Sequence, residues 1–240
     1  MTTPTPKRTI VAMGGNDLAE PYNPLLDDHV LHLARTQRRR ERPRVCFVPT
    51  ASGDSEGYVA NFYTAFARRS EASHLGLFGR TIDDLDRFAL DQDVIYVGGG
   101  NTANMLAIWR VHGLDRVLAR AWEAGVVLAG TSAGSNCWFE ASTTDSFGRL
   151  AALADGLGFL PGSHSPHYDS EPLRRPTYCR LIAQGALPAG YAVDDGAALV
   201  FEGTELVEAV ASRPGARAYR VERGPTGDAI ETGLPTRYLG

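Results

Sequence analysis

VVLAGTSAG, residues 126–134, joins a short apolar run directly to a Gly-x-Ser-x-Gly pattern. The apolar run predicts a buried strand, and the small residues on both sides of Ser132 fit a sharp turn from that strand into a helix. A serine on such a turn is held in a strained backbone conformation that lifts its Oγ clear of the sheet. Ser132 is therefore a candidate nucleophile, although an ordinary turn in which Ser132 caps the helix explains the motif alone as well.

The surrounding sequence favours an α/β fold. Short apolar runs alternate with longer amphipathic stretches, which predicts a three-layer arrangement with a mostly parallel sheet and helices on both faces. Strands are expected at residues 9–13, 45–48, 73–77, 94–97 and 126–129, and helices at residues 24–40, 56–69, 82–88 and 102–124, the last broken near residues 112–113. Later strands at 157–160, 191–193, 197–201 and 216–221, around a helix at about 177–184, predict antiparallel strands at the sheet edge.

Composition narrows the class of protein. A length of 240 residues with 43% hydrophobic content suits one domain over residues 1–240. A net charge of −4 argues against nucleic-acid binding, which needs clustered positive charge. The three cysteines lie far apart, so neither a disulfide framework nor a zinc site is expected. Without a secretory signal or about 18 consecutive apolar residues, the chain is expected in the cytoplasm and not in a membrane.

A second glycine turn follows an earlier strand in VIYVGGGN, residues 94–101. Asn101 is placed to cap the next helix, and the glycines let backbone N–H groups face a ligand. Gly100 could then supply one oxyanion donor and Ala133, at the start of a helix over residues 133–139, the other. A phosphate cradle and plain packing are the alternatives, but the Walker ending and the dinucleotide glycine spacing are absent.

Candidate bases lie in PGSHSPHY, residues 161–168, which follows a predicted strand. Pro166 fixes the backbone before His167, and a general base needs such rigidity to keep hydrogen-bond reach to a serine Oγ. His164 and His167 could instead bind zinc, but they lack a helix and a third clustered ligand.

Two aspartates could orient the base. Asp195 lies at a strand end beside a glycine, and Asp145 would give the Ser, Asp, His order of α/β-hydrolases. Chain order does not decide between them because such triads are defined by geometry. Either aspartate could also simply close a turn through backbone hydrogen bonds.

Taken together, residues 97–102, 130–134, 165–168 and 195–196 resemble the peptidase E family of serine dipeptidases, which is related to cyanophycinases. The resemblance implies a fold like that of class I glutamine amidotransferases, with Ser132 as nucleophile, His167 as base and Asp195 as the orienting acid. It favours Asp195 over Asp145, although the best-known members carry Glu at this position. It also implies an oxyanion hole formed by Gly100 and Ala133.

The resemblance further implies hydrolysis of dipeptides after an N-terminal aspartate, with no metal or organic cofactor. Cationic side chains should then meet the substrate, and Arg174, Arg175 and Arg180 are the nearby candidates. Asn101 and Asp145 are expected to contact the substrate as well, Asp145 through the free amine. The expected partner is a small peptide, and we allow for a homodimer. Other short, isoaspartyl or cyanophycin-type peptides are alternative substrates, and a non-catalytic anion-binding protein is the alternative class.

Overall fold

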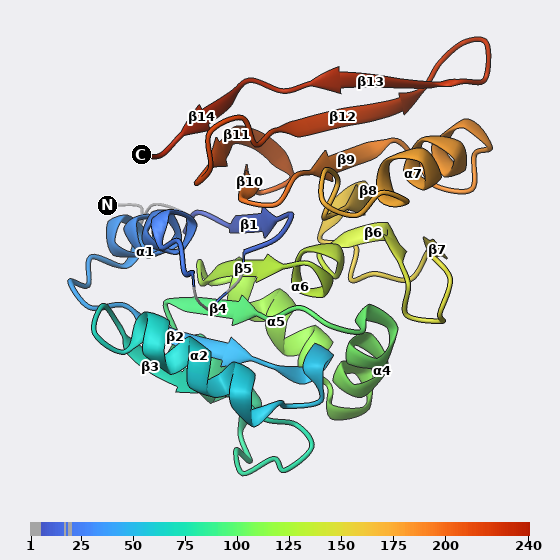
Figure 1. Ribbon diagram of the computed structural model, residues 1–240. Coiled ribbons are helices and arrows are strands. Elements are labelled where there is room, and N and C mark those ends of the chain that lie inside the picture. The colour runs from blue at the N-terminus through green and yellow to red at the C-terminus, as the bar shows by residue number, and fades with distance from the viewer. Residues whose placement is uncertain (1–5, 17, 19–20) are drawn as a thin grey trace.

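A sheet of eight strands runs through the centre of the molecule (Figure 1). The computed structural model describes residues 6–16, 18 and 21–240, and in these residues the strand order is β14-β11-β10-β1-β5-β4-β2-β3. From β1 to β3 all neighbours pair in parallel. These five strands are β1 (Thr9–Met13), β2 (Arg44–Val48), β3 (Glu71–His74), β4 (Val94–Val97) and β5 (Val127–Thr131).

Helices cover both faces of this sheet, which confirms the three-layer α/β arrangement. The residues of β1 alternate between the two layers, because successive side chains of a strand point to opposite faces. Val11 and Met13 join the core beneath α1 (Leu25–Arg38) and α2 (Glu56–Phe66). Ile10 and Ala12 join the opposite core, which is covered by α3 (Leu85–Leu90), α4 (Thr102–His112) and α5 (Leu114–Glu123).

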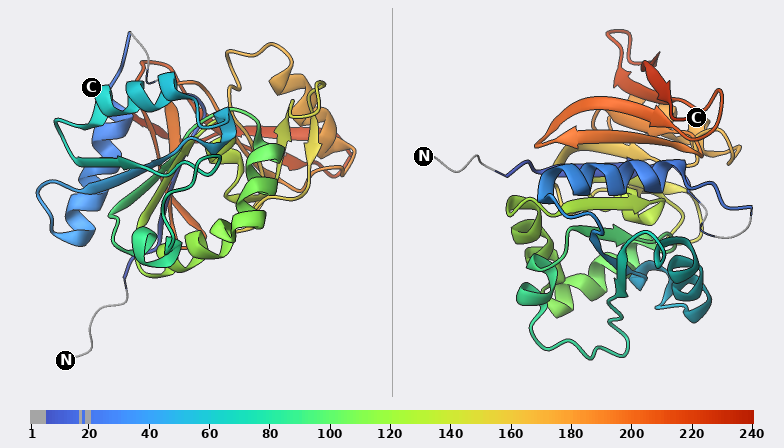
Figure 2. Two further views of the ribbon diagram at one scale, coloured as in Figure 1. Left: turned by 90° about the horizontal axis from the view of Figure 1, so that it is seen from below. Right: turned by 90° about the vertical axis from the view of Figure 1, so that its left-hand side faces the viewer.

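The C-terminal part of the chain departs from the expected edge strands. Only β10 (Ala197–Glu202) and β11 (Glu205–Ala211) extend the first sheet antiparallel, and β14 (Thr236–Tyr238) then pairs parallel to β11. The other late strands form a six-stranded second sheet, covered by α7 (Arg174–Ala183) and gathered on the side of the molecule away from β2 and β3 (Figures 1 and 2). This sheet has the order β13-β12-β9-β8-β6-β7 and consists of β6 (Phe139–Thr144), β7 (Ala151–Leu153), β8 (Leu160–Ser165), β9 (Gly190–Val193), β12 (Ala218–Arg223) and β13 (Ala229–Gly233).

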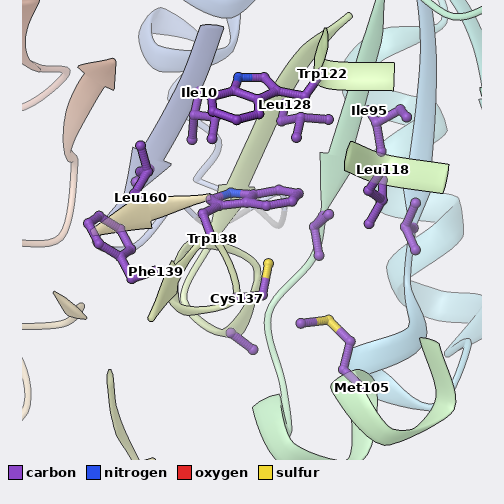
Figure 3. Close-up of a cluster of buried hydrophobic side chains, with 14 of the residues drawn as sticks. Ile10, Ile95, Met105, Leu118, Trp122, Leu128, Cys137, Trp138, Phe139 and Leu160 are labelled. Atoms are coloured by element: carbon purple, nitrogen blue, oxygen red, sulfur yellow. The ribbon is translucent and has the colours of Figure 1, made fainter. Parts of the chain in front are cut away.

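The helix after Ser132 is shorter than expected. It ends after one turn as α6 (Ala133–Asn136), where residues 133–139 were predicted to be helical. The carbonyls of Cys137 and Trp138 accept hydrogen bonds from the N–H groups of Leu157 and Leu160, which draws the chain out of the helix and into β6. Figure 3 shows the buried Trp138 side chain among those of Ile10, Leu128 and Leu160. Tertiary packing therefore overrides the local helical pattern.

Two further boundaries have local causes. The strand expected at residues 73–77 lies at 71–74, because the Asp54 carboxylate accepts from the N–H groups of Leu77 and Phe78 and ends the strand. The helix expected at residues 82–88 begins at Leu85, where Asp84 caps it by accepting from the N–H of Arg87 at 2.9 Å. Within the described ranges, every helix is too short or too polar to cross a membrane.

Candidate active site

A cavity of about 500 Å³ collects the loops that follow the parallel strands of both sheets. Ligands of open α/β sheets bind at this edge, beyond the carboxyl ends of the strands. Loops after β1, β4, β5, β8, β9 and β11 contribute to its wall, together with α2 and the segment before α1. The lining residues are Gly15, Asn16, Pro21, Asn23, Tyr58, Gly99, Thr131, Ser132, His167, Asp195, Gly196, Ser212 and Arg213.

Ser132 sits on a sharp turn between β5 and α6, with φ +56° and ψ −114°. L-residues rarely adopt a positive φ, so this backbone is strained, as the motif predicts. The flanking glycines permit the turn through close approach. A Cβ on Gly130 would lie 2.1 Å from the carbonyl oxygen of Gly134, and one on Gly134 would lie 2.3 Å from that of Val97. The Gly-x-Ser-x-Gly spacing is therefore a steric requirement of this strand-to-helix turn.

His167 lies in the loop after β8, and its Nε2 is 2.9 Å from Ser132 Oγ. Its backbone also has a positive φ of +53°, and its N–H donates to the carbonyl of Gly14 at the end of β1. The ring is half-buried, with 22% of the side chain exposed. His167 is therefore within hydrogen-bond reach of the serine proton, as a general base requires.

Asp195 follows β9 and holds the other side of the imidazole. Its Oδ1 is 2.7 Å from His167 Nδ1. Burial of the Asp195 carboxyl would raise its pKa, but hydrogen bonds from His167 and Ser170 outweigh burial and hold that pKa below its usual value. The carboxylate is charged at neutral pH and favours the tautomer with a proton on Nδ1, which leaves Nε2 to accept from Ser132.

The main chain of Asp195 is fixed on both sides. Its N–H donates to Asp169 Oδ1 at 2.9 Å, and its carbonyl accepts from Arg213 Nη2 at 2.9 Å. The next N–H, that of Gly196, donates to the carbonyl of Gly15 at 2.8 Å. These bonds bring the Asp195 backbone against the turn after β1, so a short aspartate reaches the imidazole.

The glycine turn after β4 lies beside the serine. A Cβ on Gly99 would lie 3.2 Å from Ser132 Cβ, and the Gly99 N–H donates to the Tyr58 hydroxyl at 3.2 Å. Gly100 has φ +136°, and a Cβ there would lie 2.2 Å from the carbonyl oxygen of Ala51. Among the described residues, no protein group accepts a hydrogen bond from the N–H of Gly100 or Ala133. Both N–H groups therefore remain available as donors.

The residues expected to bind substrate lie elsewhere and do not line the cavity. Asn101 caps α4 by accepting from the N–H of Asn104 at 2.9 Å, and its amide donates to the carbonyl of Ser146. Asp145 is exposed in the turn between β6 and β7, where its carbonyl accepts from the Gly148 N–H. Their roles in substrate binding stay predictions.

The three candidate arginines of α7 have protein partners, and Arg180 donates to Gln184 Oε1 at 3.2 Å outside the cavity. Arg174 is buried, donating through Nη1 to the carbonyl of Thr143 at 3.1 Å and through Nε to Glu171 at 2.6 Å. Arg175 pairs with Glu231 and lies over the rings of Tyr168 and Tyr219. None of the three arginines lines the cavity, and their proposed contact with an acidic substrate stays a prediction.

Sequence reasoning missed several residues of the cavity. Gly15 and Asn16 belong to a third glycine turn after a strand, the same signal that marked the turns after β4 and β5. The Asn16 N–H donates to Thr131 Oγ1 at 2.9 Å, and its amide donates to Asp27 Oδ1 at 2.8 Å. Burial raises the pKa of Asp27 to about 6. Arg213 follows β11, a strand without a continuous apolar run, so no local signal singled it out.

The family model of peptidase family S51 matches residues 10–209. The chain belongs to this family. A relative in Bacillus subtilis (strain 168), the uncharacterized peptidase YgaJ, is 51% identical over 235 residues, which cover 97% of this chain and 100% of that protein. Peptidase E of Streptomyces coelicolor is 31% identical over 135 residues, 54% of this chain and 53% of the relative. The predicted resemblance to peptidase E is confirmed, and the chain is a peptidase of family S51.

Solved structures support the fold. The crystal structure of a peptidase from an acI-B1 Actinobacterium matches with a TM-score of 0.70 at 16% identity, covering 97% of this chain and 96% of that chain. The expected fold of the class I glutamine amidotransferase type is confirmed by this likeness.

Proposed function

We propose that this S51 peptidase is a serine-type enzyme that hydrolyses short peptides, in particular dipeptides with an N-terminal aspartate. The observation that carries the proposal is the hydrogen-bonded chain from Ser132 Oγ to His167 Nε2 at 2.9 Å and from His167 Nδ1 to Asp195 Oδ1 at 2.7 Å. These atoms meet at the wall of the cavity, where a peptide could reach the serine. A serine hydroxyl becomes a useful nucleophile when a base in this position takes its proton.

The proposed reaction follows from these positions. His167 Nε2 accepts the Ser132 proton as Oγ attacks the peptide carbonyl carbon, and Asp195 stabilises the imidazolium that forms. The N–H groups of Gly100 and Ala133 are proposed to bind the developing oxyanion. His167 then gives its proton to the leaving amine, and water attacks the acyl-enzyme with His167 again as base.

The substrate class rests on the size of the cavity and on the family. A volume of about 500 Å³ suits a ligand of a few residues better than a protein chain. The resemblance to peptidase E supplies the preference for an N-terminal aspartate. Location in the cytoplasm is part of the proposal, supported by three free cysteines, Cys46, Cys137 and Cys179.

Replacement of the nucleophile tests the proposal. Ser132→Ala should abolish hydrolysis of Asp-Leu and labelling by a fluorophosphonate probe while the thermal unfolding transition remains. Ser73→Ala, on the edge strand β3, is the matched control and should keep both activities. Undiminished hydrolysis by Ser132→Ala would refute the assignment. If the probe fails to label the wild type and an anionic metabolite raises the thermal stability of the wild type, a binding protein is favoured.

A further inference from the structure

Arg213 is the arginine of the cavity wall. No other lining residue in the described part of the chain is an arginine or lysine. Its side chain is 47% exposed. The arginines suggested by the sequence contact other protein groups outside the cavity: Arg174 pairs with Glu171, Arg175 pairs with Glu231, and Arg180 donates to Gln184. In the described residues, the arginine at the cavity wall therefore follows β11 and does not lie on α7.

The contacts of Arg213 leave one edge of its guanidinium unused. Nη2 donates to Asp169 Oδ2 at 2.5 Å and to the carbonyl of Asp195 at 2.9 Å. In the described residues no protein acceptor pairs with Nε or Nη1. A guanidinium carries five donors, and a carboxylate can bind two of them in parallel. The ion pair with Asp169 thus fixes the group by one nitrogen and leaves donors for a ligand.

Gly196 allows Arg213 to pack closely beside Asp195. A Cβ on Gly196 would lie 3.2 Å from Arg213 Cβ and 3.7 Å from Arg213 Nε, so the side chain of the arginine lies against the turn that carries Asp195. This turn has φ +74° at Gly196. The guanidinium is thereby held at the wall shared with the acid of the proposed triad.

We propose that Arg213 binds a carboxylate of the substrate and so is a specificity-determining residue of this peptidase. The inference rests on the proposed function, because it names the specificity residue of the same site. The carboxylate has two possible sources in a dipeptide, the side chain of an N-terminal aspartate and the C-terminal carboxylate. Their chemistry at the guanidinium is the same, so the test must separate them.

Four peptides separate the two sources, namely Asp-Leu, Asn-Leu, Asp-Leu-amide and Asn-Leu-amide. Arg213→Gln should lower kcat/KM roughly 10- to 100-fold more for peptides that carry the bound carboxylate than for those that lack it. Arg213→Lys should fall between, since it keeps the charge without the fork. The carboxylate whose removal abolishes the effect is the one that Arg213 binds. An equal loss on all four peptides, or no loss, overturns the proposal.

Two matched variants separate binding from positioning of Asp195. Asp169→Asn keeps an oxygen for the Asp195 N–H but removes the charge that holds Arg213 Nη2, so it should lower kcat/KM most for the peptides that carry the bound carboxylate, by less than Arg213→Gln does. Arg237→Gln removes an exposed arginine that pairs with Glu208 on β11 and should leave all four rates unchanged. A selective loss in both variants, larger in Arg213→Gln, supports carboxylate binding. A uniform loss on all four peptides in both variants, as a displaced Asp195 would give, overturns it.

A binding measurement keeps the inference distinct from the proposed function. In a Ser132→Ala background, Asp-Leu should raise the thermal unfolding midpoint, and Arg213→Gln should remove this rise. That result supports the inference even if the wild type hydrolyses none of the peptides, in which case only the proposed function fails. Hydrolysis of all four peptides at similar rates by the wild type would leave the function standing and overturn the inference, as would an unchanged shift in Arg213→Gln.

Discussion

Gly15 approaches Asp195 so closely that a Cβ on the glycine would lie 2.1 Å from Asp195 Oδ1. The same Cβ would lie 3.0 Å from His167 Nδ1. Gly15 and Asp195 also form an isolated parallel bridge. The turn after β1 therefore presses directly against the contact between His167 and Asp195. This closeness lets a side chain as short as aspartate reach the His167 imidazole.

Gly15→Ala should disrupt the histidine and aspartate contact without unfolding the protein. The added methyl group must displace the Asp195 carboxylate, so kcat should fall roughly 10²-fold or more, since a misplacement of about 1 Å can cost that much. Peptide kinetics measure the fall, and circular dichroism checks the fold. Gly79→Ala, where no atom lies within 4 Å of the new Cβ and the backbone, like that of Gly15, has no positive φ, controls for the loss of a glycine. Wild-type kcat in Gly15→Ala would contradict this account.

Substitutions of Asp195 should separate charge from reach. Asp195→Asn keeps the shape but loses the charge and the tautomer preference, so kcat should fall by roughly 10³-fold or more. Asp195→Glu keeps the charge, but Gly15 and His167 leave no room for another methylene, so it too should be slow. Single-turnover rates with a dipeptide ester measure both. Wild-type rates in Asp195→Glu would show that the backbone adjusts freely.

Ser135→Ala should impair the positioning of the nucleophile. Ser135 Oγ donates to the carbonyl of Ser132 at 2.8 Å and lies 3.0 Å from His164 Nε2. These bonds stabilise the strained turn at Ser132. Their loss should lower kcat several-fold and the free energy of unfolding by about 1 kcal/mol, with KM little changed. Ser135→Thr, which keeps a hydroxyl, should recover part of kcat. Equal losses in kcat for both variants would instead indicate a packing effect.

His164 should make the protein sensitive to acid. Burial, with a smaller contribution from the charge of Arg174, lowers its pKa to about 3, whereas an unfolded histidine titrates near 6.5. Between these values the unfolded chain binds a proton that the native state does not. The free energy of unfolding should therefore rise with pH in this window, by at most about 1.4 kcal/mol per pH unit from this group.

Comparison with His164→Gln isolates this contribution. Asp27 and Asp194, whose pKa values burial raises to about 6, act in the opposite direction between roughly pH 4 and 6. Because both proteins share these aspartates, the difference between their slopes reports on the histidine. Urea unfolding between pH 4.5 and 6.5 measures the slopes. The wild type should show the steeper rise, and parallel slopes would contradict the buried neutral histidine.

Local signals predicted most of the hydrogen-bonded series Ser132, His167 and Asp195, because each of these residues follows a strand in a distinctive turn. Ser132 was marked by the glycines that its steric environment demands, and His167 by the proline before it. Asp195 was favoured by the family resemblance, and its hydrogen bond to His167 agrees with that choice. Its catalytic role, like those of Ser132 and His167, stays a prediction.

The second sheet escaped prediction because its first strand looks polar. Ser142, Thr143 and Thr144 of β6 are buried, and Thr143 Oγ1 donates to Ser165 Oγ at 2.7 Å. Buried hydroxyls satisfied in this way carry no apolar periodicity. The position of Arg213 at the cavity could not be predicted for a similar reason, since it depends on pairing between strands distant in sequence.

His167 and Asp195, which form a hydrogen-bonded chain with Ser132, come later in the sequence than the serine. The His167 N–H donates to the carbonyl of Gly14, and Asp195 forms a bridge with Gly15. Both residues follow strands of the second sheet, which are synthesised after Ser132. During synthesis, a chain that has emerged only through residue 132 lacks His167 and Asp195, which form the hydrogen-bonded chain with the Ser132 hydroxyl. In the proposed mechanism Ser132 becomes reactive only when residues 160–195 pack against the turn after β1, so a truncated or half-made chain should not hydrolyse peptides.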